Sequence, residues 1–187
     1  MAKVDWYVAQ VQTGKEDRTC LAIERACEDC YVRGEPLVTE CFSPTFVHRL
    51  KYSGEWRDVE KPLLPGYVVA VTSNPEELAR RLNKVPSFTK LLTMAESFVP
   101  LREDERAWID GFTKPGDRVV PISIGHRVGD VVVVTEGPLK GREAMITQII
   151  RKKCLAVLEL HVGGKNVTTT VGLAVLPKAV DKQSVGE

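Results

Sequence analysis

Helical periodicity occurs on only one side of a Pro/Gly break in this 187-residue chain. The break lies at 113–117 (sequence TKPGD), and before it apolar residues recur at both helical and strand spacing. After it they form only short runs, separated by glycine-containing or basic turns. Proline and glycine interrupt regular structure. We therefore expect an N-terminal domain at 1–112, a linker at 113–122 and a C-terminal domain at 123–180.

The first domain is expected to begin with a strand and a helix. Residues 6–12 (WYVAQVQ) are aromatic, β-branched and alternating, which predicts a strand. Thr13 and Glu16 then have the spacing of a capping box, in which each side chain accepts a hydrogen bond from the other residue's backbone N–H. The helix should end near Gly34 and Pro36, and its apolar stripe consists of Cys20, Ile23, Cys27 and Tyr31.

The rest of the first domain predicts a β-hairpin, a central strand and two more helices. The hairpin turns at Ser53-Gly54, and a second capping box, from Asn74 to Glu77, starts the next helix. We expect hairpin strands at 37–50 and 51–59, a central strand at 67–71, a helix with Leu78, Leu82 and Val85 on its buried side, and a third helix at 101–112. This order predicts an α+β domain with a mainly antiparallel sheet flanked by helices.

The C-terminal domain is expected to be an autonomous all-β unit on a flexible tether. Short strands are predicted at 130–135, 142–151, 154–160 and 167–173. Closing them into a small barrel removes the edges that a flat sheet would expose. The β-branched runs in the first and last of these strands disfavour a helix. We therefore expect a stable barrel.

Composition and charge indicate a soluble chain with partners of two kinds. Charged residues make up 27% and hydrophobic residues 43%, which is typical of a globular protein. The start, MAKVDWYVAQ, lacks the apolar core of a signal peptide, and no apolar run approaches the ~20 residues of a membrane span. We expect a cytoplasmic protein with no membrane partner. Residues 1–110 carry 15 Lys/Arg against 18 Asp/Glu, whereas residues 121–187 carry 9 against 6, so the two domains should attract different partners.

Neither a metal site nor a catalytic site is indicated. Cys27 and Cys30 form a C-x-x-C, but a structural zinc ion needs two more ligands, and only Cys20 and Cys41 are candidates. Because Cys20 and Cys27 lie on the predicted apolar stripe, buried free thiols are the favoured interpretation. The three histidines are scattered, with no nucleophile or metal ligand at a suitable spacing. We expect no metal, no cofactor and no enzymatic activity.

Two groups of motifs resemble the NusG family of transcription factors. Residues 128–141 (VGDVVVVTEGPLKG), with apolar Ala144 and Ile146 after them, resemble a KOW motif. The first domain resembles the NusG N-terminal domain in four segments that follow the family's order: WYV at 6–8, TGKE at 13–16, CFSP at 41–44 and PLLPGYV at 62–68. The similarity spans nearly the whole chain. It implies a NusG N-terminal domain joined to a small SH3-like KOW barrel.

The resemblance implies a monomeric elongation factor of bacterial RNA polymerase. In the family, the N-terminal domain binds a coiled coil of the largest polymerase subunit through a hydrophobic depression. Leu64 and Tyr67 match positions of the family's Pro-x-x-Pro-Gly-Tyr pattern that line it, although the family commonly has Phe in place of Leu64. Phe88, Leu91 and Leu92 are candidates for its rim. Each of the five could instead be a plain core residue, because apolar residues on strands and helices are usually buried.

Departures from the general family pattern point to RNA. Leu139 stands where general members have an aromatic residue, and the turns nearby are basic. Residues 121–187 contain no Phe, Tyr or Trp to stack unpaired bases, so a structured RNA, such as a hairpin in the nascent leader, fits better than a single strand. If the turns share one end of the barrel, the candidate RNA-binding residues are Lys140, Arg142, Arg151, Lys152, Lys153 and Lys165. The alternative is that the turns are merely solvated.

The sequence thus indicates a processive antitermination factor, a specialised paralogue of the LoaP or RfaH kind. Lys15, Arg18 and Arg25 on the first helix are candidates for contact with the non-template DNA strand, as corresponding surfaces are in the family. A solvated helix face is the simpler interpretation. Two alternatives stay open. One is a general NusG factor whose KOW domain recruits a ribosomal protein or a termination factor. The other is a ribosome-associated KOW protein, which the acidic N-terminal half disfavours.

Overall fold

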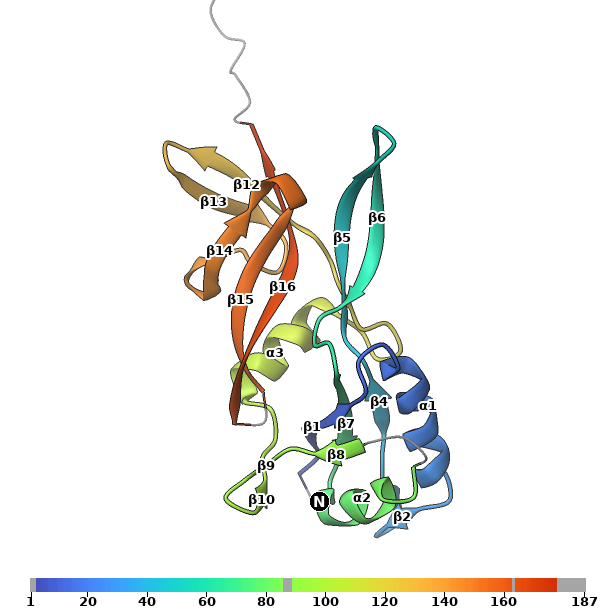
Figure 1. The fold of residues 1–187 in the computed structure, drawn as a ribbon. Coiled ribbons are helices and arrows are strands. Elements are labelled where there is room, and N and C mark those ends of the chain that lie inside the picture. Colours follow the sequence, from blue (N-terminus) through green and yellow to red (C-terminus); the bar gives the residue numbers. More distant parts are fainter. Residues whose placement is uncertain (1–2, 86–88, 163, 178–187) are drawn as a thin grey trace, which may run out of the picture.

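The computed structural model describes residues 3–85, 89–162 and 164–177, and its N-terminal domain is built on a four-stranded sheet (Figure 1). The strand order is β4-β7-β1-β8 and all neighbours are antiparallel, as predicted for this domain. The strands are β1 (Asp5–Val11), β4 (Glu40–Phe42), β7 (Tyr67–Thr72) and β8 (Thr89–Leu91). The central pair, β1 and β7, confirms the two strands expected at 6–12 and 67–71.

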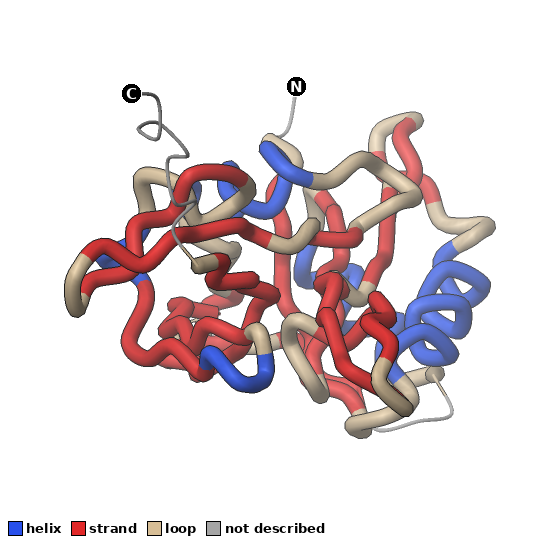
Figure 2. The backbone as a smooth tube through the Cα atoms, turned by 90° about the horizontal axis from the view of Figure 1, so that it is seen from above, coloured by secondary structure: helices blue, strands red, loops and turns tan. Residues whose placement is uncertain are grey.

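Both faces of this sheet are covered. Helices α1 (Glu16–Cys27) and α2 (Pro75–Leu82) pack on one face, where Ala9 of β1 joins their buried cluster. Helix α3 (Glu103–Phe112) and the C-terminal domain cover the other face, where Trp6 and Val8 are buried. Side chains alternate along a strand, so β1 contributes to both clusters. The view from above shows α1 on the side of the N-terminal domain away from the C-terminal strands (Figure 2).

A long hairpin, β5 (Thr45–Tyr52) and β6 (Glu55–Pro62), projects from the N-terminal domain alongside the C-terminal strands (Figure 1). It turns at Ser53-Gly54 as predicted, with positive φ at both residues. The single strand expected at 37–50 is wrong. Pro44 separates β4 from β5, and these strands belong to different sheets. The shorter strands are β2 (Tyr31–Val32), β3 (Glu35–Pro36), β9 (Thr93–Met94), β10 (Ser97–Phe98) and β11 (Val119–Val120).

The structure confirms one of the two predicted capping residues and contradicts the other. Asn74 caps α2 as predicted, since its side-chain oxygen accepts from the Glu77 N–H at 3.0 Å. The box at the start of α1 is wrong, because the N-cap is Lys15, without a side-chain hydrogen bond. The buried Glu16 carboxylate instead accepts from the Gly66 N–H at 2.8 Å. Burial opposes its ionisation, but backbone N–H groups outweigh this and lower the pKa of Glu16.

The end of the first helix also differs from the expectation. Helix α1 ends at Cys27, and Tyr31 is 65% exposed in β2 instead of extending the apolar stripe. The other three stripe residues are buried as predicted, namely Cys20, Ile23 and Cys27.

The C-terminal domain is a five-stranded half-barrel in the order β13-β12-β16-β15-β14. It confirms the all-β prediction and adds β12, a strand not singled out from the sequence. No pairing of β13 with β14 closes the sheet in the described residues. Its elements are β12 (Ser123–Val128), β13 (Val131–Glu136), β14 (Ile146–Ile150), β15 (Leu155–Val162) and β16 (Lys165–Leu176), with 3-10 turns η1 (Glu143–Met145) and η2 (Arg151–Lys153).

The expectation that the C-terminal domain hangs free on a flexible tether is wrong for this structure, whereas its autonomy stays a prediction. One buried cluster runs from Trp6 and Trp108 of the N-terminal domain to Leu139, Leu158 and Leu173 of the half-barrel. Each fully buried side chain of this size contributes about 1.5–3 kcal/mol. The two domains therefore share one hydrophobic core, which we call the closed arrangement.

The segment between the domains is also held in place. Arg118 has only 5% of its side chain exposed, and its guanidinium donates to Glu40 at 2.9 and 2.5 Å and to Asp110 at 2.8 Å. It also stacks on Trp6 and Phe42, at 4.9 and 4.7 Å from the ring centres. The next residue begins β11, which pairs with β5 in parallel. The linker boundaries at 113–122 stay a prediction.

Candidate functional site

Predicted polymerase-binding residues lie on the sheet face that the half-barrel covers. Leu64 and Leu92 are buried in the cluster shared by both domains, and Tyr67 packs against it half-buried. Leu91 is buried in the other cluster, on the side of α1 and α2. Phe88 lies outside the described residues. Three of the five thus share one apolar face, and that face is closed off from solvent.

Hydrogen bonds hold the half-barrel on this face. The Thr169 hydroxyl on β16 donates to the Leu63 carbonyl, one residue before Leu64. The Trp108 indole of α3 donates to the Pro138 carbonyl at 3.1 Å. Both bonds are buried, so each donor would lose its partner on separation unless water replaced it.

The Gly-Pro loop of the KOW-like motif is therefore part of the domain contact. Leu139 is completely buried, and its N–H donates to the Ser123 hydroxyl at 3.1 Å. Lys140 and Gly141, which follow Leu139, are exposed. The sequence prediction treated the loop as an RNA-binding element and missed this anchoring role. The signal in the sequence for this role was Leu139 itself, an apolar residue within a short polar loop.

A close backbone approach marks the contact between β16 and β5. A Cβ atom on Gly172 would lie 2.2 Å from the Val47 carbonyl oxygen, far closer than any side chain tolerates. Glycine at this position lets the two strands from different domains pack directly together.

The six predicted RNA-binding cations do not share one end of the half-barrel. Arg151, Lys152 and Lys153 form η2 at the start of β15, whereas Lys165 follows its end. Eight strand residues separate these ends, roughly 25 Å at about 3.3 Å per residue. Lys140 and Arg142 lie on the loop that is anchored to α3. All but the half-buried Arg142 are exposed.

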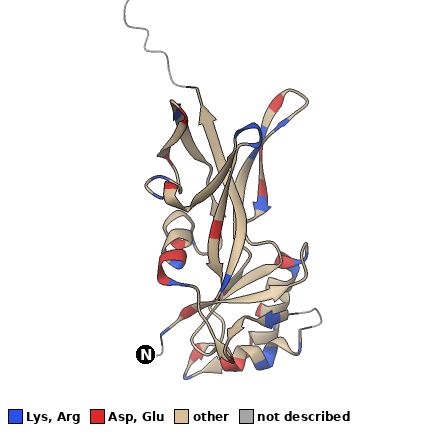
Figure 3. Cartoon of the chain, turned by 60° about the vertical axis from the view of Figure 1, so that its left-hand side comes forward, with Lys and Arg blue, Asp and Glu red and all other residues tan. Residues whose placement is uncertain are grey.

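The η2 cations lie beside the hairpin of the N-terminal domain. His48 of β5 places Nε2 2.8 Å from the Lys153 carbonyl, and because a carbonyl only accepts, Nε2 carries the hydrogen. Figure 3 shows the basic turn next to further basic residues of the hairpin. In the closed arrangement the cations of this turn face solvent, and the hairpin of the N-terminal domain lies beside them.

The predicted DNA-binding residues form a separate region. Lys15, Arg18 and Arg25 are exposed on α1 or at its start. They lie on the helix-covered side of the sheet, opposite the half-barrel.

Comparison with known proteins identifies the family. The family model described as "Transcription termination factor nusG" matches residues 4–110, and the KOW motif model matches residues 128–160. The first match alone spans more than half of the chain. The chain belongs to the NusG family. It is a NusG-type transcription factor with an N-terminal NusG domain and a KOW domain.

Full-length relatives and a solved structure agree with the NusG assignment. The "Transcription termination/antitermination protein NusG" of Helicobacter pylori is 25% identical over 165 residues, which covers 87% of this chain and 92% of the relative. The protein of the same name from Campylobacter jejuni is 25% identical over 172 residues, covering 91% and 95%. The solved structure described as "Domain interaction in Thermotoga maritima NusG" shares the fold, with a TM-score of 0.52, 18% identity, and coverage of 91% and 94%.

Other features of this NusG-family chain indicate no further chemistry. In the part of the chain that the structure describes, no group of three or more His, Cys, Asp or Glu residues could hold a metal ion. The five cysteines are free thiols, four of them buried. Burial, then the neighbouring Cys30, raises the pKa of Cys27 to about 11, so this thiol stays protonated at neutral pH. Among the described residues, no helix is long and apolar enough to span a bilayer.

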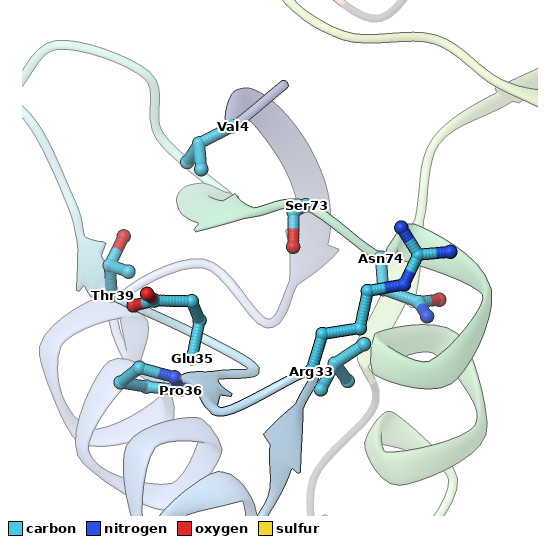
Figure 4. Close-up of a pocket in the computed structure, with 8 residues that line it drawn as sticks. Val4, Arg33, Glu35, Pro36, Thr39, Ser73 and Asn74 are labelled. Carbon is cyan, nitrogen blue, oxygen red and sulfur yellow. The ribbon is translucent and has the colours of Figure 1, made fainter. Parts of the chain in front are cut away.

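A pocket of about 490 Å³ lies near the start of β1, at the β2–β3 loop and the start of α2. Figure 4 shows the side chains arranged around it. Its lining contains none of the residues predicted to bind polymerase, RNA or DNA, and consists of Val4, Val32, Arg33, Glu35, Pro36, Thr39, Ser73 and Asn74.

One domain contact should depend on pH. Glu105 of α3 is buried, and one carboxylate oxygen accepts from the His161 N–H while the other has no partner in the structure. Burial raises the pKa of Glu105 despite this bond. The folded state then binds the proton more tightly than the unfolded state. The contribution of Glu105 to the free energy of unfolding is therefore fully present below the ordinary pKa of a glutamate. It is lost as the pH rises through the raised pKa of Glu105 in the folded protein.

Glu105→Gln should remove that pH dependence, because glutamine keeps an acceptor for His161 and carries no charge. Urea unfolding at a series of pH values measures it. Glu103→Gln, in the same helical turn but exposed, should leave the dependence unchanged, and an equal effect of both changes would contradict the assignment.

Proposed function

We propose that this chain is a transcription elongation and processive antitermination factor, a specialised paralogue of the LoaP or RfaH kind. Its N-terminal domain binds RNA polymerase, and its KOW domain binds a structured nascent RNA. The observation that carries the proposal is the combination of a buried apolar face on the N-terminal domain with an outward-facing basic turn on the KOW domain.

Polymerase binding in this proposal requires the half-barrel to move away. Leu64 and Leu92 can meet a coiled coil of the largest polymerase subunit only when the face they share is uncovered. The closed arrangement is then a form that is not competent to bind polymerase, and polymerase selects the open form by its higher affinity for it. A domain interaction is also named for the Thermotoga maritima relative.

RNA binding in this proposal centres on Arg151, Lys152 and Lys153. Three consecutive exposed cations on one turn suit the phosphates of an RNA duplex, which is recognised through its backbone and shape. The other predicted cations, Lys140, Arg142 and Lys165, lie on separate surfaces. We do not include them in the central site.

Salt dependence tests the RNA role. The affinity of the full chain for an RNA hairpin should fall steeply as salt rises, because bound counterions are released from the RNA. Replacing Lys152 or Lys153 by alanine should flatten the slope of log K against log salt by about one unit per lost phosphate contact. Lys165→Ala, an exposed cation at the other end of β15, is the matched control and should change the slope little. Salt-insensitive binding, or equal effects of all three changes, would rule out this site.

One observation favours a second function, the recruitment of a protein by the KOW domain. Val131 and Val133 alternate on β13 and are 65% and 44% exposed, next to Val128 at 51%. This apolar strip could receive a ribosomal protein or a termination factor, as in a general NusG factor. Val131→Lys should abolish such recruitment and leave RNA binding unchanged.

A further inference from the structure

The tip of the β5–β6 hairpin carries two large exposed aromatic side chains, each with a cation stacked on it. Tyr52 is 66% exposed, with the Arg57 guanidinium 5.6 Å from its ring centre. Trp56 is 56% exposed, with the Lys51 ammonium 5.9 Å from its ring centre. A cation on one side of a ring leaves the other side open for stacking. The tip therefore offers one aromatic platform on each face of the hairpin, because Trp56 pairs with Lys51 and Tyr52 pairs with Glu55.

The Tyr52 platform lies on the hairpin face that meets the basic turn of the KOW domain. Side chains alternate along a strand, so Tyr52 shares its face with His48, four residues earlier, roughly 13 Å along β5. His48 donates to the Lys153 carbonyl at 2.8 Å. The closed arrangement therefore sets one aromatic platform and the cationic η2 turn on the same side of the hairpin, with the two parts coming from different domains.

Charge on this surface favours a polyanion. No carboxylate lies within ion-pair distance of Arg151, Lys152 or Lys153 among the described residues. The acidic residues of the hairpin are partly neutralised. Asp58 is held by Arg49 in two bonds of 2.7 Å, and Glu55 lies 3.6 Å from Arg57.

We propose that the hairpin tip and η2 form a composite binding surface for a nucleic acid hairpin, with an unpaired loop base on Tyr52 and stem phosphates on Arg151, Lys152 and Lys153. Trp56 pairs with Lys51 across the hairpin and therefore lies on the opposite face, outside this surface. The proposal rests on the RNA-binding function proposed above and names the part of the ligand that this site reads. Unpaired bases stack on aromatic rings, whereas duplex phosphates need only cations. The KOW domain has no aromatic residue of its own between 121 and 187. The N-terminal domain supplies Tyr52 in the closed arrangement, so this surface reads the hairpin before the domains separate and polymerase binds.

The experiment uses the full chain and fluorescence anisotropy with four probes. They are an RNA hairpin with a short uridine loop, the same stem as a blunt RNA duplex, and the DNA versions of both. Tyr52→Ala should weaken binding of the looped hairpin by about tenfold and leave the blunt duplex unchanged. Trp56→Ala, on the other face of the hairpin, should change neither. Tyr31→Ala is the matched control, because Tyr31 is equally exposed at 65% but lies on β2. It should change neither.

The outcomes separate this proposal from the one on which it rests. Lys152→Ala combined with Lys153→Ala should weaken looped and blunt probes alike. If it does so while Tyr52→Ala has no effect on the looped probe, the composite surface is overturned and the basic site stands. If no probe binds, both are overturned. A loop-specific loss with Tyr52→Ala but not with Trp56→Ala supports the proposal. Tighter binding of the RNA hairpin or of the DNA hairpin identifies which of the two nucleic acids is read.

Discussion

Gly172→Ala is expected to separate the two domains and to raise the affinity for RNA polymerase by about tenfold or more. The added Cβ would lie 2.2 Å from the Val47 carbonyl oxygen, a backbone atom that can move only if β5 moves. The next contact, at 2.9 Å, is with the Ile122 side chain, which can adjust. The variant should therefore keep the half-barrel and lose the closed arrangement. Polymerase affinity rises with the fraction of open molecules.

Small-angle scattering and a polymerase binding titration check this result together. The radius of gyration should increase, while circular dichroism should show unchanged β-structure. Gly111→Ala is the control, since a Cβ there meets nothing within 4 Å. An unchanged radius of gyration in Gly172→Ala would contradict the close approach. A larger radius without tighter polymerase binding would contradict the covered docking face.

Arg118→Ala is expected to destabilise the protein by about 3 kcal/mol, the second largest effect. The change removes a buried cation that pairs with Glu40 and Asp110 and stacks on two aromatic rings. Breaking a buried ion pair from one side leaves the remaining charge without compensation. It also releases the segment that carries β11. Urea unfolding measures the loss.

Arg106→Ala is a closely matched control for that experiment. Arg106 also stacks on Trp6, at 5.5 Å, and pairs with Asp5 at 3.5 Å, but 37% of its side chain is exposed. Exposed pairs contribute about 0–1 kcal/mol. Equal losses from the two arginine changes would show that burial of Arg118 does not determine its effect.

Most secondary structure could be predicted because local pattern determines it. The strands with alternating or continuous apolar residues, β1 and β7, and the Asn74 cap of α2 follow from neighbouring residues alone. The α1 cap failed because Glu16 binds Gly66, fifty residues later in the chain. A local rule has no access to such a partner. Pro44 interrupts the predicted strand at 37–50 for a local reason that the apolar pattern concealed.

The candidate site was predictable in residue type but not in arrangement. The residues proposed to bind polymerase and RNA were chosen from motif resemblance and residue type, yet their burial and their separation depend on how the two domains pack. Leu139 is the clearest case, since the loop that was expected to be cationic and exposed is apolar where it contacts α3. The aromatic residues missing from the KOW domain lie on the hairpin of the other domain, which no analysis of residues 121–187 could show.

The closed arrangement itself is tested most directly by nuclear magnetic resonance of the Trp108 indole N–H in the full chain. This group lies in a buried contact and donates across the domain boundary to the Pro138 carbonyl. We predict slow exchange of this proton with solvent, nuclear Overhauser contacts to Pro138 and Leu139, and one common tumbling time for both domains. Fast exchange, no contact between the domains and two separate tumbling times would contradict the closed arrangement.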